Sequence, residues 1–450
     1  MSQKLDSSHF KLNLNVDEHR RFRDDRFWQL IPEWSAVSTE EFNDDKWQMK
    51  NSIKKVEQVK KVLGDRLSSA VFQDMLDGQK KTPMNIRITP YIFALINWDD
   101  PVGDPLRKQF LPLGSQFLND HPFYKEDSLN EDVDSPVSML THRYHDKALL
   151  LPTTICPVYC SYCTRSRLIG GSTELVDKET YGFNTQKMEQ VFEYLKHHSE
   201  IEDIVISGGD AFMLTAKQLT YLGESLLSIE HIRRIRIATK GVAIYPQKIL
   251  TDDDWFHALK NIHHFGKERG KSVFLHTHFS SPREITQWTK LAMERIFSEG
   301  IIVRNQAVLQ SGVNDDINEM VLLIKKLSYM NVQPYYVYMH DMVPGCEHFR
   351  TTIEYGVELE KAVRGTTAGF NTPTFVCDLP GGGGKRHVAS YEYYDREKGI
   401  SVWVAPNVKP GKVFTYFDPL RFLNPDIQQK YTNEKERELL VKEAIKRAGF

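Results

Sequence analysis

The sequence lacks the features that would place the protein in a membrane or on nucleic acid. Its 450 residues contain no run of 18 apolar residues, so we expect no membrane-spanning helix. The first 25 residues have no apolar core of the kind a secretory signal needs. Basic and acidic residues nearly balance, and the net charge of -2 excludes the basic surface typical of nucleic-acid binding. The sequence therefore predicts a cytoplasmic protein with no membrane or nucleic-acid partner.

Cysteine is also scarce, and its placement is more informative than its number. Five cysteines in so long a chain do not suit a secreted disulfide framework. Three of them, Cys156, Cys160 and Cys163, fall within eight residues. Cys346 and Cys377 stand alone, and we interpret both as packing residues. Clustered cysteines in a chain expected in the cytoplasm indicate metal or redox chemistry.

The chain has no internal repeat or low-complexity tract, and its pattern changes twice. Residues 1–120 are charged and predict a helical region, with helices beginning at Ser38 and near Pro90. Residues 121–385 predict the core. Residues 386–450 predict a C-terminal extension with a few strands and a charged helical tail at 433–449.

Within the core, short apolar runs alternate with longer amphipathic stretches. Apolar strands that alternate with helices are typical of a parallel sheet covered by helices. Six such units in series predict an α/β fold, a partial (β/α)6 barrel, with its chemistry in the loops after the strands. The expected strands are residues 148–151, 204–206, 235–238, 273–276, 301–304 and 334–338, and the expected helices are 185–197, 216–227, 252–263, 282–297 and 318–327.

The clustered cysteines follow the first expected strand with the spacing C-x3-C-x2-C. Three thiolates can bind three irons of a 4Fe-4S cluster, and with no fourth cysteine nearby the fourth iron stays open. S-adenosylmethionine can chelate that iron through its amino and carboxylate groups. The alternatives are a zinc site, with His142 or His145 as a fourth ligand, or simple packing. The spacing favours the cluster, since both histidines precede the strand.

Two glycine-rich segments also follow apolar runs. Residues 207–210, Ser-Gly-Gly-Asp, come after the second expected strand, where glycine lets backbone approach a ligand closely. Such a segment usually forms an ordinary turn at the end of a strand. Beside the cysteine cluster, the segment 207–210 is similar to the motif by which radical S-adenosylmethionine enzymes bind the methionine amino group.

Residues 380–385 place four glycines before Lys385, which indicates either a flexible loop or a lysine that forms a Schiff base with an aldehyde cofactor.

Together these residues resemble the lysine 2,3-aminomutase family. The resemblance runs from about Trp47 to Lys385 and rests on residues 142–144, 156–165, 207–210, 334–336, 347–351 and 378–385. It implies a radical S-adenosylmethionine barrel, and an isomerase that interconverts L-lysine and β-lysine on pyridoxal phosphate by 2,3-amino migration.

The resemblance implies a role for each matching residue. Lys385 is the catalytic residue, because it matches the lysine that binds pyridoxal phosphate covalently. Lys147 stands where better-known members have arginine, which keeps the charge but loses the planar fork. The implied ligands are Cys156, Cys160 and Cys163 for the 4Fe-4S cluster, Ser207, Gly208, Gly209 and Asp210 for S-adenosylmethionine, Lys385, Arg143 and Lys147 for pyridoxal phosphate, and Arg165, Asp341 and Asp378 for the substrate.

The chain also departs from the family. Familiar members bind zinc through cysteines near the C-terminus, and here no cysteine follows Cys377, so we do not expect zinc. The implied partners are an amino acid substrate, an electron donor such as flavodoxin or ferredoxin, and further copies in a homo-oligomer. Three alternatives remain: an aminomutase for another amino acid such as arginine, a radical enzyme that has lost pyridoxal phosphate, and a non-catalytic Fe-S or zinc binding protein. Polar groups spread over several loops argue against the third.

Overall fold

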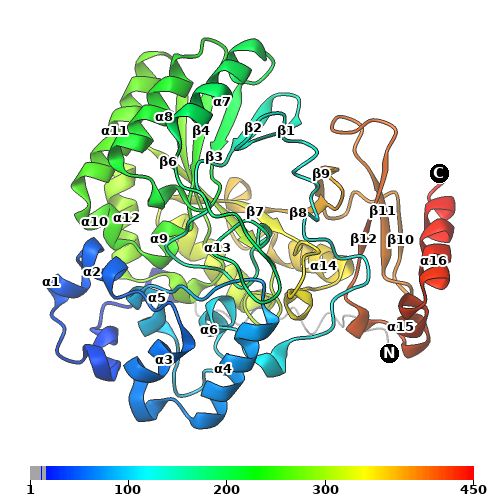
Figure 1. Cartoon of the computed structure of the whole chain (residues 1–450), viewed down its shortest axis with the longest axis horizontal. Coiled ribbons are helices and arrows are strands. Elements are labelled where there is room, and N and C mark those ends of the chain that lie inside the picture. Colours follow the sequence, from blue (N-terminus) through cyan, green and yellow to red (C-terminus); the bar gives the residue numbers. More distant parts are fainter. Residues whose placement is uncertain (1–11, 13–16) are drawn as a thin grey trace.

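A computed structural model describes Leu12 and residues 17–450 of the chain. Figure 1 shows a group of short N-terminal helices, a curved sheet with helices around it, and a small second sheet with two helices at the C-terminal end. Residues 1–11 and 13–16, part of the predicted helical region, lie outside the described residues. The division into domains at residues 1–120, 121–385 and 386–450 stays a prediction.

A nine-stranded sheet with its strands in sequence order forms the centre of the molecule. β2 to β8 are parallel, and β1 and β9 are antiparallel at the two edges. All six predicted strands are present, which confirms the α/β barrel pattern. The sheet consists of β1 (Leu140–Tyr144), β2 (Lys147–Leu150), β3 (Asp203–Ile206), β4 (Arg234–Ala238), β5 (Ser272–Thr277), β6 (Ile302–Val308), β7 (Val332–Tyr338), β8 (Thr374–Leu379) and β9 (Gly384–His387).

Helices connect the parallel strands and cover the sheet. On α7, Met188, Val191, Phe192 and Leu195 are buried, the helical spacing that made this segment predictable. The predicted helix at 282–297 is shorter, because Pro282–Glu284 forms a separate 3-10 turn and Thr286 caps α12. The helices are α7 (Thr185–His197), α8 (Ala216–Ser228), α9 (Gly241–Ile244), α10 (Gln247–Thr251), α11 (Asp253–Glu268), α12 (Gln287–Ser298), α13 (Ile317–Tyr329) and α14 (Ile353–Val363).

The sheet curves until its two edge strands meet. The backbone N–H of Lys385 in β9 donates to the Tyr144 hydroxyl of β1 at 3.0 Å. A Cβ added at Gly384 would lie 2.7 Å from the same hydroxyl, so glycine permits this approach. The closure brings the end of the glycine-rich turn against β1.

The N-terminal helices lie against the barrel (Figure 1). Ser38 and Glu41 form a capping box, and Pro90 occupies the first turn of α5, which confirms both predicted helix starts. The Tyr91 hydroxyl donates to the Glu284 carbonyl oxygen at 3.1 Å and so ties α5 to the core. The helices are α1 (Thr39–Phe42), α2 (Asp45–Lys50), α3 (Val56–Leu63), α4 (Ser69–Lys81), α5 (Pro90–Leu95) and α6 (Pro105–Phe110).

The C-terminal extension forms a three-stranded antiparallel sheet with two helices beside it. The buried Asp418 carboxylate accepts from the Ile353 N–H at 2.8 Å and anchors the extension to α14. The predicted tail is confirmed as α16, capped by Asn433. No helix in the described part of the chain is long and apolar enough to cross a membrane. The elements are β10 (Tyr393–Asp395), β11 (Ile400–Val404), β12 (Val413–Phe417), α15 (Pro425–Thr432) and α16 (Glu434–Arg447).

Candidate functional site

The three clustered cysteines lie in the long loop after β2, where barrel enzymes place their chemistry. All three are free thiols. Burial raises the pKa of Cys160 to about 12, and burial likewise raises the pKa of Cys156 and of Cys163. These thiols therefore stay protonated at neutral pH until bound metal ions provide compensating positive charge.

The spacing of the three sulfurs bears on which metal group they fit. In the described residues, no set of three His, Cys, Asp or Glu ligand atoms that includes a cysteine lies within 4.8 Å of one another. A single tetrahedral zinc ion would draw its thiolates to about 3.8 Å. A cluster spreads its thiolates over several iron atoms, so it does not need sulfurs this close together.

Gly208 and Gly209 pack closely against the segment that leads into the cysteine loop. Gly208 has φ +95°, and a Cβ there would lie 2.4 Å from the Thr153 carbonyl oxygen. The N–H of Gly209 donates to that oxygen at 2.5 Å, and the Asp210 N–H donates to the Ile155 carbonyl at 3.0 Å. These two amides are therefore used within the protein and fix the segment that leads into Cys156.

The Asp210 carboxylate is buried and joins neighbouring loops. It accepts from the Thr239 hydroxyl at 2.5 Å, the Lys240 N–H at 2.8 Å and the Phe212 N–H at 2.9 Å. Burial raises its pKa. The structure thus gives Asp210 a positioning role, and direct contacts of Asp210 and Ser207 with S-adenosylmethionine stay predictions.

Two neighbouring acids come from the ends of β7 and β8. Asp341 follows β7 and accepts from the Thr164 hydroxyl at 2.5 Å. Asp378 lies in β8, with a carboxylate oxygen 3.5 Å from the Lys385 Nζ. The Oδ1 atoms of both acids are buried and find no hydrogen-bond partner in residues 17–450. Such orphaned buried oxygens fit a cationic group that the protein itself does not supply.

The electrostatics of the two acids agree with a cation site. Burial, followed by the negative charge of Asp378, raises the pKa of Asp341 to about 7. A bound cation would lower that pKa by stabilising the charged form. The fold therefore brings the predicted pair of substrate acids close together, beside Lys385.

Arg165 is held by a residue that the sequence did not single out. Its Nε and Nη2 donate to the Glu131 carboxylate at 2.7 to 3.2 Å, and Glu131 is 7% exposed. Arg165 holds the pKa of Glu131 below its usual value against the opposing effect of burial. None of these contacts uses Nη1, so one edge of the guanidinium stays open toward a second carboxylate.

Lys385 stands at the end of the glycine turn among acids and tyrosines. Its amino group lies 5.5 Å from the Tyr144 ring centroid and 5.7 Å from that of Tyr338. Burial acts to lower the pKa of Lys385, but Tyr338, Asp378 and Tyr144 outweigh it and hold the pKa well above its usual value. The lysine is therefore charged in the ligand-free protein.

The glycine turn does not offer its amides to a phosphate. The N–H of Gly381 donates to the Ser128 carbonyl, and those of Gly382 and Gly383 both donate to the Leu379 carbonyl. The amides of these three glycines are therefore not available to a phosphate beside Lys385. This separates the turn from the amide cradle of a P-loop.

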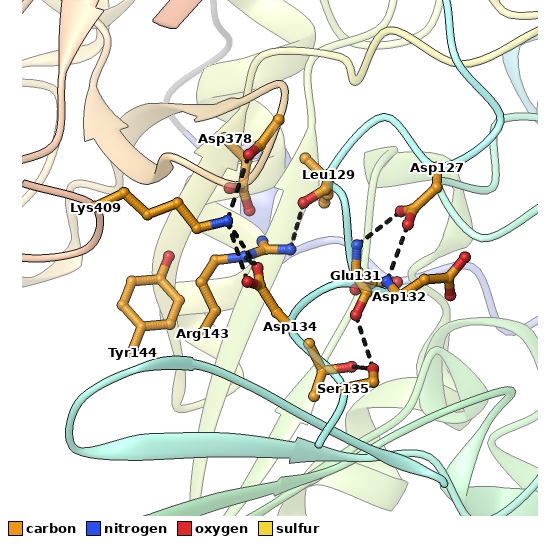
Figure 2. Close-up of polar contacts among 12 residues, drawn as sticks. Asp127, Leu129, Glu131, Asp132, Asp134, Ser135, Arg143, Tyr144, Asp378 and Lys409 are labelled. Carbon is orange, nitrogen blue, oxygen red and sulfur yellow. Dashed lines mark hydrogen bonds and ion pairs between the residues drawn. The ribbon is translucent and has the colours of Figure 1, made fainter. Parts of the chain in front are cut away.

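Cationic side chains for that purpose meet at Asp134 (Figure 2). Arg143 donates from Nε to Asp134 at 2.7 Å, and the Lys409 Nζ lies 3.1 Å from the same carboxylate. A Cβ at Gly382 would lie 2.5 Å from the Lys409 Nζ, so the glycine leaves room for this lysine. Lys147 instead pairs with the neighbouring Asp146 at 2.8 Å. Its Nζ lies over the Tyr144 ring at 4.4 Å.

Sequence reasoning missed three of these side chains. Glu131 and Asp134 belong to an acidic stretch before β1, a signal that could have been noticed. Lys409 gave no signal, because it comes from the C-terminal extension and reaches the site only through the fold. Cys346 and Cys377 are 1% and 0% exposed, which confirms that they pack in the interior.

Known proteins were compared with the chain. No protein-family model matches it. The chain is 40% identical over 357 residues to an L-lysine 2,3-aminomutase of Acetoanaerobium sticklandii, covering 79% of this chain and 80% of that protein. It is 37% identical to an L-lysine 2,3-aminomutase of Clostridium subterminale, covering 86% of each. It is 30% identical to a glutamate 2,3-aminomutase of Clostridioides difficile, covering 77% of this chain and 76% of that protein.

Proposed function

The chain belongs to the lysine 2,3-aminomutase family of isomerases, and from this we propose that it interconverts L-lysine and β-lysine by moving the α-amino group from C2 to C3. The observation that carries the choice of lysine is the acid pair Asp341 and Asp378, whose buried Oδ1 atoms lack a partner within the described chain. Family membership also sets aside the alternative of a non-catalytic Fe-S binding protein.

Three bound groups are needed, and the protein's residues fit each of them. When bound, the cluster and S-adenosylmethionine would supply a carbon radical that abstracts hydrogen, and pyridoxal phosphate would supply the unsaturation at the substrate nitrogen to which a neighbouring carbon radical can add. Cys156, Cys160 and Cys163 would hold the cluster, and the Ser207–Gly208 turn would lie beside S-adenosylmethionine. Lys385 would bind pyridoxal phosphate through its amino group.

Arg165 would fix the substrate by its carboxylate. The Glu131 carboxylate occupies the Nε and Nη2 edge and orients the guanidinium, so the substrate would bind at the open Nη1 side. Charge-assisted hydrogen bonds of this kind contribute roughly 1.5–3 kcal/mol each.

Asp341 and Asp378 would hold the distal ammonium group of lysine. Two buried carboxylates side by side would repel the side-chain carboxylate of glutamate, so we do not expect glutamate as a substrate. Arginine shares the charge of lysine but needs room for a planar guanidinium. Asp378 also lies 3.5 Å from the Lys385 amino group, so it can hold the proton that this amine must release before it reacts.

Cations would bind the cofactor phosphate. Arg143 and Lys409 both contact Asp134, which leaves the group with one net positive charge for an anion. Lys147 adds a third cation from β2. The electron donor, such as flavodoxin or ferredoxin, the homo-oligomeric assembly and the cytoplasmic location stay predictions.

A competition assay tests the proposal. The reconstituted protein, kept free of oxygen and given a reductant, would receive equal amounts of L-lysine, L-arginine and L-glutamate. We expect lysine to be consumed with formation of β-lysine, and Asp378→Asn to slow this at least tenfold. If arginine were consumed preferentially, the protein would instead be an aminomutase that acts on arginine. Consumption of glutamate would contradict the role of the acid pair.

A further inference from the structure

A second group of metal-binding side chains lies outside the site just described. It consists of His142 in β1, His198 at the end of α7 and Glu200 before β3. Their ligand atoms all lie within 4.8 Å of one another, and no other trio of His, Cys, Asp or Glu in the described residues is this close. His142 is a candidate zinc partner of the cysteines by sequence, but the fold places it with His198 and Glu200.

The three side chains are held in place before any ion binds. The Nδ1 of His142 shares a hydrogen bond with the Tyr194 hydroxyl at 2.9 Å, which leaves Nε2 as the ligand atom. The Tyr194 ring stacks on His198 with centroids 3.9 Å apart. Metal-binding histidines ordinarily have their second nitrogen fixed by such a partner, which sets the tautomer and the ring orientation.

The carboxylate completes the set. The His198 Nδ1 lies 2.8 Å from a Glu200 carboxylate oxygen, within hydrogen-bonding distance, so an ion that binds both atoms would displace the proton they share. The side chains of His198 and Glu200 are 35% and 31% exposed, so an ion can enter from solvent and keep a water ligand. A set of three protein ligands with one open position is the arrangement of many zinc sites.

We propose that His142, His198 and Glu200 bind one divalent transition-metal ion, with zinc as the best match. Two imidazoles and one carboxylate suit zinc, whereas magnesium and calcium take oxygen ligands. The site contains no cysteine, so it differs from the C-terminal cysteine site whose absence led us to expect no zinc.

The position of the site gives the ion a structural effect. β1 is an edge strand of the nine-stranded sheet, and it carries Arg143 and Tyr144 immediately after His142. Zinc would link this edge strand to the end of α7 and to the segment that enters β3. It would thereby stabilise the strand that closes the barrel on Lys385.

Calorimetric titration with zinc chloride tests the proposal on protein whose cysteines already hold iron. We expect one zinc ion to bind per chain, and affinity to fall at least tenfold in His198→Ala and in Glu200→Gln. His197→Ala is the matched control, because His197 is the exposed neighbour in the last turn of α7, and we expect wild-type affinity. Zinc should raise the melting temperature of wild type and control only.

X-ray absorption at the zinc edge identifies the ligands. Nitrogen and oxygen neighbours alone, with an imidazole signature that weakens in His198→Ala, are the expected result. Sulfur neighbours would assign the ion to cysteine, and equal binding by all four proteins or none by wild type would overturn the proposal. None of these readouts depends on aminomutase activity.

Discussion

At the scale of single residues, Asp341 and Asp378 each bury a carboxylate oxygen that has no hydrogen-bond partner in the described chain. A buried polar atom without a partner costs roughly 1–3 kcal/mol, and Asp341 and Asp378 each leave one such atom within the described structure. The family resemblance predicted both acids. It did not predict that Thr164 would donate to Asp341 or that Glu131 would hold Arg165, since these contacts join residues 177 and 34 positions apart.

The raised pKa of Asp341 predicts a dependence of stability on pH. Its pKa is about 7 in the folded protein, against roughly 4 for an unfolded carboxyl. The folded state therefore keeps a proton that the unfolded state loses, so this residue lowers the free energy of unfolding as pH rises from about 4 to 7. As pH rises from about 4 to 7, we expect the melting temperature of ligand-free Asp341→Asn to rise relative to that of wild type. The control is Asp24→Asn, at an exposed position, whose melting temperature should differ from that of wild type by the same amount at every pH. A constant difference for Asp341→Asn would contradict the burial assigned to this carboxyl.

Arg165 gives a prediction about substrate affinity. Arg165→Lys keeps the charge, but a single ammonium cannot hold Glu131 and a substrate carboxylate with two separate edges. We expect the KM for lysine to rise roughly ten- to a hundredfold, the equivalent of one lost charged hydrogen bond. Arg396→Lys, which changes an exposed arginine paired with Glu354 away from the site, should leave KM near the wild-type value. Steady-state kinetics at full cluster content measure both, and equal effects would refute the role of Arg165.

At the scale of elements, helices and strands were more predictable than the loops that carry chemistry. Helix α7 begins and ends where its apolar spacing predicted, because that spacing follows directly from burial of one face. β8 was not predicted, since Thr374 and Asp378 interrupt its apolar pattern. The cysteine loop and the glycine turn were recognised by their residues, but their backbone contacts come from the fold.

The contact between Gly208 and the cysteine loop can be tested by substitution. Alanine at this position meets a left-handed φ of +95° and the Thr153 carbonyl oxygen at 2.4 Å. The conformation alone costs roughly 1–2 kcal/mol, so Gly208→Ala should displace the loop and lower the iron bound on reconstitution by more than half. Gly182→Ala, where nothing lies within 4 Å of the added Cβ, is the control. Full iron content in Gly208→Ala would show that this contact does not position the cysteines.

The C-terminal extension contributes Lys409. Its expected contact with the cofactor phosphate can be tested separately from imine formation at Lys385. Lys409→Ala should weaken binding of pyridoxal phosphate roughly tenfold, the value of a charged contact, while binding of pyridoxal, which lacks the phosphate, stays unchanged. Absorbance of the imine with Lys385 reports both affinities. Lys412→Ala, an exposed lysine of the same loop, should match wild type. Equal weakening for the two aldehydes would rule out a phosphate contact by Lys409.

At the scale of the whole molecule, barrel closure unites the parts of the site. β1 and β9 are 241 positions apart at the Tyr144–Lys385 contact, and this contact sets Lys385 opposite the acids of β7 and β8. The sequence predicted the barrel because strand and helix periods are local properties. It could not predict which distant loops meet, or that Lys409 would reach Asp134 across 275 positions.

The central claim is that nitrogen moves from C2 to C3 of lysine within one molecule. It is tested most directly with L-lysine that carries heavy nitrogen only in its α-amino group, incubated without oxygen with the fully reconstituted protein and a reductant. The account predicts β-lysine with the heavy nitrogen at C3 in every labelled molecule, and no product from Lys385→Ala, which should retain its cluster. Product whose C3 nitrogen is unlabelled, or lysine left unchanged by protein that still cleaves S-adenosylmethionine, would contradict it.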